Sequence, residues 1–121
     1  MPHEDVASFL PLSPAVFHVM VSLADGSRHG YAIIKDVAER TGGAERLGAG
    51  TLYAIIKRLL SDDLIGEIAG GEADSRSDQR RRYYRLTALG RRVAKAEAER
   101  LERAVASARS SRLLPAPSST R

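Results

Sequence analysis

The 121-residue sequence predicts a mainly helical fold that contains one small β-hairpin. Three observations support this prediction. Residues 47–61 carry apolar side chains at helical spacing, and two short strand-like runs, residues 64–68 and 80–87, follow around a polar loop. After the second run, residues 88–110 form a long amphipathic stretch with a narrow apolar stripe.

The helix expected over residues 47–61 has two faces with different chemistry. The apolar face carries Leu52, Ile55, Ile56, Leu59 and Leu60. The opposite face carries Thr51, Tyr53, Ala54, Lys57 and Arg58. Gly48 and Gly50 keep the entering backbone small, so a phosphate can approach the unpaired N–H groups of the first turn. This pattern predicts a DNA-recognition helix. The alternative for Tyr53 is a ring packed at the helix entry.

The hairpin that follows is rich in arginine. Residues 76–92 contain seven arginines against one acid, Asp78, and three of them, Arg80, Arg81 and Arg82, are consecutive. A charge run is usually a solvated face. Placed on a hairpin directly after a recognition helix, however, it favours phosphate contacts, and this order of elements is that of a winged helix-turn-helix. The wing therefore joins the expected DNA-binding surface.

The first half of the chain predicts two further helices. Ser13-Pro14 is a helix-start signal, and the helix it begins runs to about Ala24. Its apolar residues lie on more than one side, so we expect Phe17 and Met20 to contact a partner subunit. A second, amphipathic helix over residues 32–40 ends at Gly42-Gly43. Residues 1–10 have no firm period and are expected to be flexible.

The last helix predicts subunit pairing. Its stripe, which we expect to form a dimer interface, includes Leu89, Val93, Ala98, Leu101 and Val105. Charged residues line the flanks, Glu97 among them. The alternative is an ordinary helix packed on its own domain. Residues 111–121 are rich in proline and serine, and we expect a disordered tail.

Composition argues against several other classes of protein. The net charge of +4 suits a polyanionic partner but is weak evidence alone. There is no cysteine, which is compatible with a reducing cytoplasm, and the three histidines lack partners at metal-ligand spacing. No apolar run reaches the length of a membrane span. We therefore expect no catalysis, metal, cofactor or membrane insertion, and a cytoplasmic protein.

The sequence resembles the PadR family of bacterial transcriptional regulators. The resemblance rests on four stretches in the family's order: LSPAVFHVMVSLADG, HGYAIIKDV, GTLYAIIKRLLSDDLI and RRRYYRLTALGRR. It implies a winged helix-turn-helix domain over residues 11–87 and a dimerisation helix over 88–110. It also implies that Tyr31 reaches a DNA phosphate, although a ring packed at the helix entry is an equal alternative for this residue.

Three departures from the family pattern are visible. Ala49 and Ala54 stand where many members have proline, and Asp63 stands where a glycine often ends the recognition helix. Asp tolerates a left-handed backbone less easily than glycine but better than most residues. The chain also has one C-terminal helix, as in the short branch of the family.

These observations predict a homodimeric regulator that binds a double-stranded DNA operator, most simply as a repressor. The resemblance implies relief by a small-molecule effector or stress signal, but no residue identifies it. The alternative is a winged-helix module for protein–protein contact or RNA binding without operator specificity.

Overall fold

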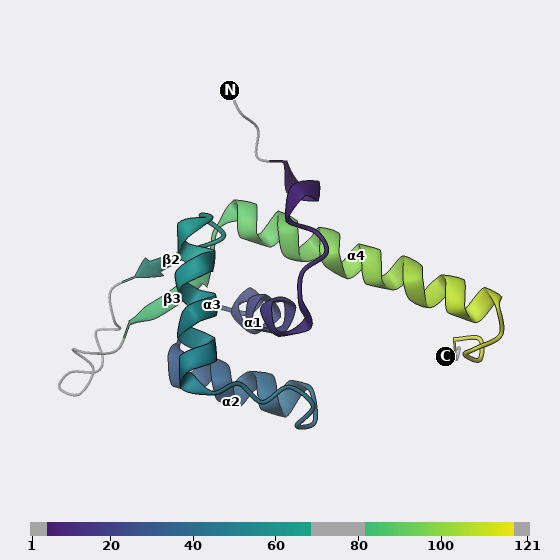
Figure 1. The fold of residues 1–121 in the computed structure, drawn as a ribbon, viewed down its shortest axis with the longest axis horizontal. Coiled ribbons are helices and arrows are strands. Elements are labelled where there is room, and N and C mark those ends of the chain that lie inside the picture. The colour runs from purple at the N-terminus through teal and green to yellow at the C-terminus, as the bar shows by residue number, and fades with distance from the viewer. Residues whose placement is uncertain (1–4, 69–81, 118–121) are drawn as a thin grey trace.

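The computed structural model describes residues 5–68 and 82–117. A 3-10 helix, η1 (Val6–Phe9), precedes α1 (Pro14–Ala24), β1 (Arg28–His29), α2 (Gly30–Arg40) and α3 (Ala49–Ser61). The chain continues through β2 (Ile65–Ile68), β3 (Tyr83–Leu86) and α4 (Ala88–Ser110). Figure 1 shows α1, α2 and α3 gathered beside the sheet, with α4 running away from them. The prediction of a mainly helical fold with a small sheet is confirmed.

The expected helix boundaries follow from capping residues. The Ser13 side chain accepts a hydrogen bond from the Val16 amide at 3.2 Å, and Pro14 occupies the first helical position of α1. Thr87 caps α4 in the same way, since its hydroxyl accepts from the Gly90 amide at 2.9 Å. The chain leaves α2 through Gly42 and Gly43, whose positive φ angles of 61° and 88° glycine adopts without strain.

The sheet has one more strand than the predicted hairpin. All three strands are antiparallel in the order β1-β3-β2, and Ile65 lies opposite Leu86 in the β2–β3 pair. The additional strand, β1, pairs Arg28 with Tyr84 and His29 with Tyr83. It attaches the start of α2 to the hairpin.

One hydrophobic core joins the helices to the sheet. Its buried members include residues of α1 (Val19, Met20, Leu23), α2 (Ile33, Val37), α3 (Leu52, Ile56, Leu59) and the segments after it (Leu64, Ile65, Tyr84, Val93). Two of these residues, Met20 and Val93, were expected in a dimer interface. Each is 0% exposed within the single chain, so that expectation is wrong for both.

Residues 1–10 and 111–121 were predicted to be flexible or disordered, and the structure describes residues 5–10 and 111–117 of these segments. Residues 5–10 include η1, which Asp5 caps through its carboxylate, and η1 packs against α4. After α4 the chain turns back: the Leu113 amide donates to the Ala108 carbonyl at 2.9 Å. Residues 1–4 and 118–121 lie outside the described part.

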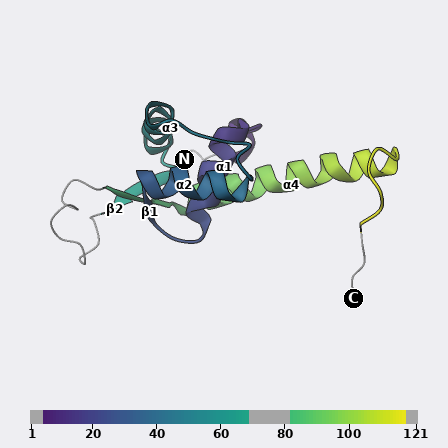
Figure 2. The same ribbon diagram turned by 90° about the horizontal axis from the view of Figure 1, so that it is seen from below.

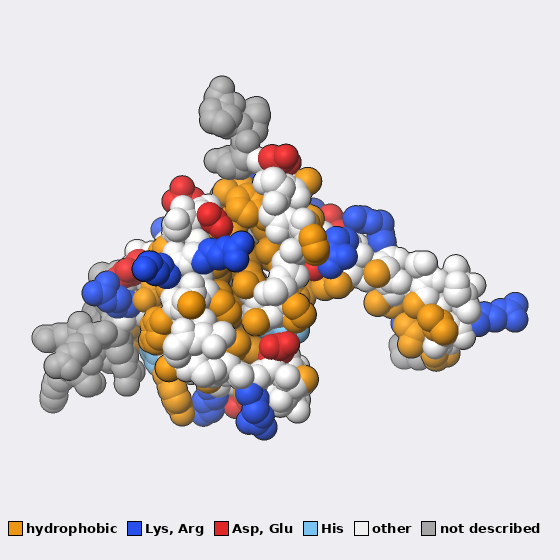
Figure 3. All heavy atoms as spheres, viewed as in Figure 1, with side chains coloured by type: hydrophobic (Ala, Val, Ile, Leu, Met, Phe, Trp, Pro, Cys, Tyr) orange, Lys and Arg blue, Asp and Glu red, His pale blue; other side chains and the backbone are white. Residues whose placement is uncertain are grey.

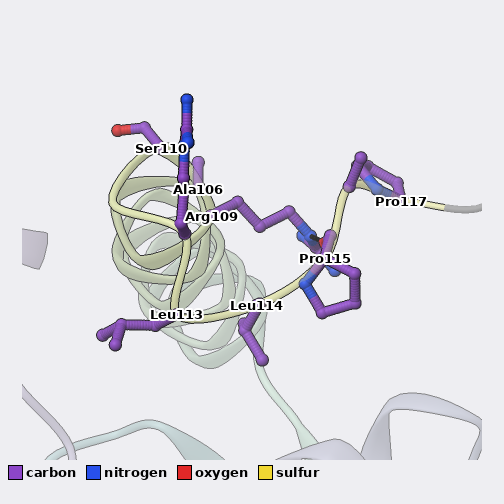
Figure 4. A pocket seen from close by; sticks show the side chains of 9 residues that line it. Ala106, Arg109, Ser110, Leu113, Leu114, Pro115 and Pro117 are labelled. Carbon is purple, nitrogen blue, oxygen red and sulfur yellow. Dashed lines mark hydrogen bonds between the residues drawn. The ribbon is translucent and has the colours of Figure 1, made fainter.

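The turn after α4 leaves a hollow against the last helical turn. Arg109 Nε donates to the Pro115 carbonyl at 2.9 Å, and Figure 4 shows the Arg109 side chain extending from the helix towards Pro115. Figure 2 shows this end of α4 far beyond the other helices. Within the described residues, the second half of α4 thus extends beyond the other helices, and only the turn after it packs against its end.

Candidate nucleic-acid interface

The outward face of α3 matches the sequence prediction residue by residue. Leu52, Ile56 and Leu59 are buried. The five residues expected on the other face are all exposed: Thr51, Tyr53, Ala54, Lys57 and Arg58. In Figure 3, the viewed face of α3 carries few acidic atoms, and basic side chains lie beside its upper half. A helix with these two faces can be held by the core and still touch another molecule.

The first turn of α3 is open to an approaching ligand. Its N-cap, Gly48, offers no side chain to the amides of that turn. A Cβ added at Gly48 or Gly50 would meet no atom within 4 Å, so nothing in the described residues obstructs this end of the helix. Unpaired N–H groups and the positive end of the helix dipole favour an anion there.

Two tyrosines lie near the start of α2. Tyr31 is 69% exposed, so its ring is not packed at the helix entry. Tyr53 is 49% exposed but is also a packing residue, because its phenol lies against Gly30, the first residue of α2. The two alternatives for Tyr53, contact with a ligand and packing at a helix entry, therefore describe different parts of one side chain.

The wing is only partly described. Arg80 and Arg81, which were expected to contact DNA, lie outside the described residues. Arg82 is exposed and forms an ion pair with Glu67 across the hairpin, with Nη1 and Oε2 at 2.9 Å. Glu67 therefore competes with any anionic ligand for this guanidinium. Arg85, on β3, is also exposed.

A buried tyrosine connects the wing to the recognition helix. Burial raises the pKa of Tyr84, and the charge of Glu67 and the proximity of Tyr53 raise it further. Beside it, the rings of His29 and Tyr83 meet edge to face with centroids 5.4 Å apart. His29, the N-cap residue of α2, thus contacts the sheet through its ring.

Other arginines are engaged away from this surface. Arg40 binds both Asp25 and Asp36, and Arg28 Nε donates to the Ser22 carbonyl at 2.8 Å. Arg28 Nη2 also lies 3.7 Å from Asp36. These contacts fasten α1 to α2. The basic residues of the outward face of α3 are Lys57 and Arg58, and Arg58 Nε lies 4.0 Å from the Asp62 carboxylate at the end of the helix.

The expected dimerisation residues separate into three groups by burial. Ala98, Leu101 and Val105 are exposed, the latter two by 37% and 39%. Phe17 and Leu89 are half-buried, whereas Met20 and Val93 belong to the core. The exposed group lies on the second half of α4.

Sequence reasoning missed one buried charge. Glu97, expected on a charged flank of α4, is 1% exposed. Its carboxylate accepts two hydrogen bonds from Arg100, at 2.9 and 2.8 Å, and a third from the Leu12 amide at 3.3 Å. The hydrogen bonds from Arg100 hold the pKa of Glu97 below its usual value, against the effect of burial. The i, i+3 spacing to Arg100 was visible in the sequence, but the contact with Leu12 was not.

Residues 5–68 and 82–117 contain no group of three histidine or acidic side chains that could hold a metal ion. Nor does any helix in those ranges have the length and apolar character of a membrane-spanning helix.

Known proteins resemble this chain in both sequence and fold. A curated, uncharacterised protein of Lysinibacillus sphaericus is 32% identical over 69 residues, which are 57% of this chain and 61% of that protein. A PadR family transcription regulator from Clostridium difficile is 28% identical, with a TM-score of 0.69 over 81% of this chain and 97% of that one. A PadR family regulator from Eggerthella lenta is 27% identical, with a TM-score of 0.60 over 92% of this chain and 87% of that one.

The match to a family model covers most of the domain described above. It spans residues 19–96, from α1 through the first half of α4, and the model is that of the transcriptional regulator PadR-like family. Members of this family are transcriptional regulators and not enzymes. Because the match covers more than half of the 121 residues, the chain belongs to the PadR-like family of transcriptional regulators.

Proposed function

We propose that this protein regulates transcription by binding a specific DNA operator as a homodimer, and that it acts as a repressor. The observation that carries the proposal is the outward face of α3. It combines an unobstructed first turn with exposed Thr51, Lys57 and Arg58, on a helix whose other face is fixed in the core. Polar side chains on a rigid helix can read base edges in the major groove.

The wing and α2 would supply affinity and register. Tyr31 and Tyr53 offer phenol hydroxyls beside α3, and the arginines of the hairpin, Arg80 to Arg82, offer positive charge. Contacts from such groups to phosphates position a protein on the duplex but carry no sequence information. Specificity then falls to α3, and repression follows from occupying promoter DNA. A small-molecule or stress signal that changes the distance between the two DNA-binding domains of the dimer would relieve repression.

The second half of α4 is the proposed pairing surface. Leu101 and Val105 are exposed, and Ala98 lies one turn before them. They belong to the part of α4 that extends beyond the other helices (Figure 2). A second copy of α4 would remove these side chains from water. Two-fold pairing would also place two copies of α3 for successive major grooves, about 34 Å apart along the duplex.

The alternative function is binding of protein or RNA without operator specificity. A winged helix can serve as a protein-binding or RNA-binding module, and the exposed face of α3 would suit either. The two functions differ in sequence preference: an operator-binding regulator should bind its site at least ~10³-fold more tightly than random duplex.

Selection of bound duplexes from a random pool tests the proposal. We expect the purified 121-residue chain to enrich a two-fold-symmetric sequence whose half-sites are about one helical turn apart. Enrichment of no duplex, together with equal affinity for random sequences, would overturn operator binding in favour of the alternative.

Pairing is tested separately by two charged substitutions. The double variant Leu101→Glu, Val105→Glu should sediment as a monomer, because it would place carboxylates within an apolar interface. The matched control, Arg103→Glu with Ser107→Glu, adds two carboxylates to the opposite side of the same helix and should remain dimeric. If the stripe variant stays dimeric, the subunits pair through another surface.

A further inference from the structure

A glycine is needed at position 30 because a larger residue would collide with a neighbouring side chain, and not because the backbone there adopts a conformation that favours glycine. It is buried as the first residue of α2, and its φ angle lies outside the positive range that favours glycine. A Cβ at this position would lie 2.3 Å from Tyr53 Oη and 2.9 Å from Tyr53 Cζ. Both distances are far below van der Waals contact. Any other residue at position 30 would therefore displace the Tyr53 phenol.

The atoms that would collide belong to one side chain at the surface. Tyr53 is 49% exposed, so its ring can rotate into solvent to make room. The collision involves the tip of the ring and no backbone atom. Replacement of Gly30 by alanine should thus cost little fold stability, and alanine is also the better helix former. The substitution should instead change the position of the Tyr53 hydroxyl.

We propose that Gly30 is a positioning residue for DNA binding: the absence of its Cβ seats the Tyr53 phenol across the start of α2, where α2, α3 and the sheet meet. This inference rests on the proposed operator binding. A seated phenol presents its hydroxyl at one fixed point beside the first turn of α2. A phenol that swings freely must be ordered when DNA binds, which weakens the complex.

Four proteins test this coupling: the wild type, Gly30→Ala, Tyr53→Ala and the double variant. Affinity for the selected duplex is measured by fluorescence anisotropy, and stability by urea unfolding. We expect Gly30→Ala to weaken binding by up to about tenfold, the cost of ordering one side chain on binding, while the unfolding midpoint stays near that of the wild type. In the Tyr53→Ala background, Gly30→Ala should weaken binding no further.

A matched control separates displacement of the Tyr53 phenol from the general effect of adding a methyl group. Gly66 lies in β2, and a Cβ there would meet no atom within 4 Å. Gly66→Ala should therefore leave the NMR signal of the Tyr53 ring unchanged. An equal shift of that signal in Gly30→Ala and in Gly66→Ala would overturn the proposal.

Ring-labelled tyrosine gives a readout that needs no DNA. The chain has four tyrosines, so the Tyr53 ring signal can be assigned by its change in Tyr53→Phe. It should shift in Gly30→Ala. An unshifted ring, wild-type affinity in Gly30→Ala, or a loss that persists without the Tyr53 ring would each overturn the inference. If the wild type selects no duplex, the proposed function and this role in DNA binding fail together, whereas a ring shift would still establish the seat itself.

Discussion

Removing the charge of Glu97 should destabilise the fold, and only above acidic pH. The carboxylate is 1% exposed and accepts three hydrogen bonds, two from Arg100 and one from the Leu12 amide. Glu97→Gln keeps the shape of the side chain but replaces one acceptor oxygen by an NH₂ donor. That donor would face an N–H group of Arg100 or of Leu12.

The size of the effect follows from what is left unpaired. Loss of a hydrogen bond to a charged group typically costs about 1.5–3 kcal/mol. Arg100 keeps 40% of its side chain in water and can be rehydrated, which argues against the larger cost of breaking a fully buried pair. We therefore expect Glu97→Gln to lower the free energy of unfolding by about 1–3 kcal/mol at pH 7.

The pH dependence has a definite sign. The pKa of Glu97 in the folded chain is lowered, chiefly by the hydrogen bonds from Arg100. A lowered pKa contributes stability that is present above the unfolded value, about 4.3, and is lost as the pH falls through the folded value. The difference between the wild type and Glu97→Gln should accordingly shrink as the pH is lowered below about 4.

Urea unfolding at a series of pH values measures this difference. Glu99→Gln is the matched control, since Glu99 is exposed and its nearest cation, Lys95, lies 3.6 Å away at the surface. Its effect should stay within about 0.5 kcal/mol at every pH. The reasoning is refuted if Glu97→Gln matches the wild type at pH 7, or if its deficit is as large in acid as at neutral pH.

Two further substitutions separate packing from surface chemistry. Ile56→Ala should lose about 2–5 kcal/mol of stability by leaving a core cavity, whereas the adjacent Lys57→Ala should stay within about 0.5 kcal/mol and lower operator affinity with a reduced salt dependence. Thermal unfolding and duplex titration at several salt concentrations distinguish them, and equal stability losses would mean that the two faces of α3 are wrongly assigned. Gly90→Ala should destabilise the fold by about 1–3 kcal/mol or more, because its Cβ would lie 1.9 Å from the Leu64 carbonyl oxygen; unfolding at wild-type temperature would contradict this.

Much of the fold follows from signals that act over a few residues. Ser13 and Thr87 cap helices because their hydroxyls reach the amides three residues later, which sequence spacing alone specifies. Asp63, expected at a position that often holds glycine, does adopt a positive φ of 62°. The strand β1 was not predictable in this way. It is two residues long and exists only because β3 offers a free edge beside it.

The outward face of α3 was predicted because periodicity decides which residues share a face. Periodicity does not decide what covers that face. Met20 and Val93 lie on apolar stripes as Leu101 does, yet the single chain covers the first two and leaves Leu101 exposed. The assignment of Met20 and Val93 to a dimer interface failed for that reason. Glu97 was misplaced because the segment that buries it, around Leu12, is 85 residues away.

The two buried glycines at helix starts also show that sequence pattern does not reveal which atoms lie opposite a residue. Gly30 and Gly90 both lie in the first turn of a helix, and neither needs a positive φ. At Gly90 an added Cβ would meet the backbone carbonyl of Leu64, which can move only together with β2, the strand that follows it. At Gly30 it would meet the tip of the Tyr53 side chain, which can swing away. Alanine should therefore cost stability at one position and ligand affinity at the other. The difference depends on which atom happens to lie opposite, and only the folded arrangement of α2, α3 and β2 supplies it.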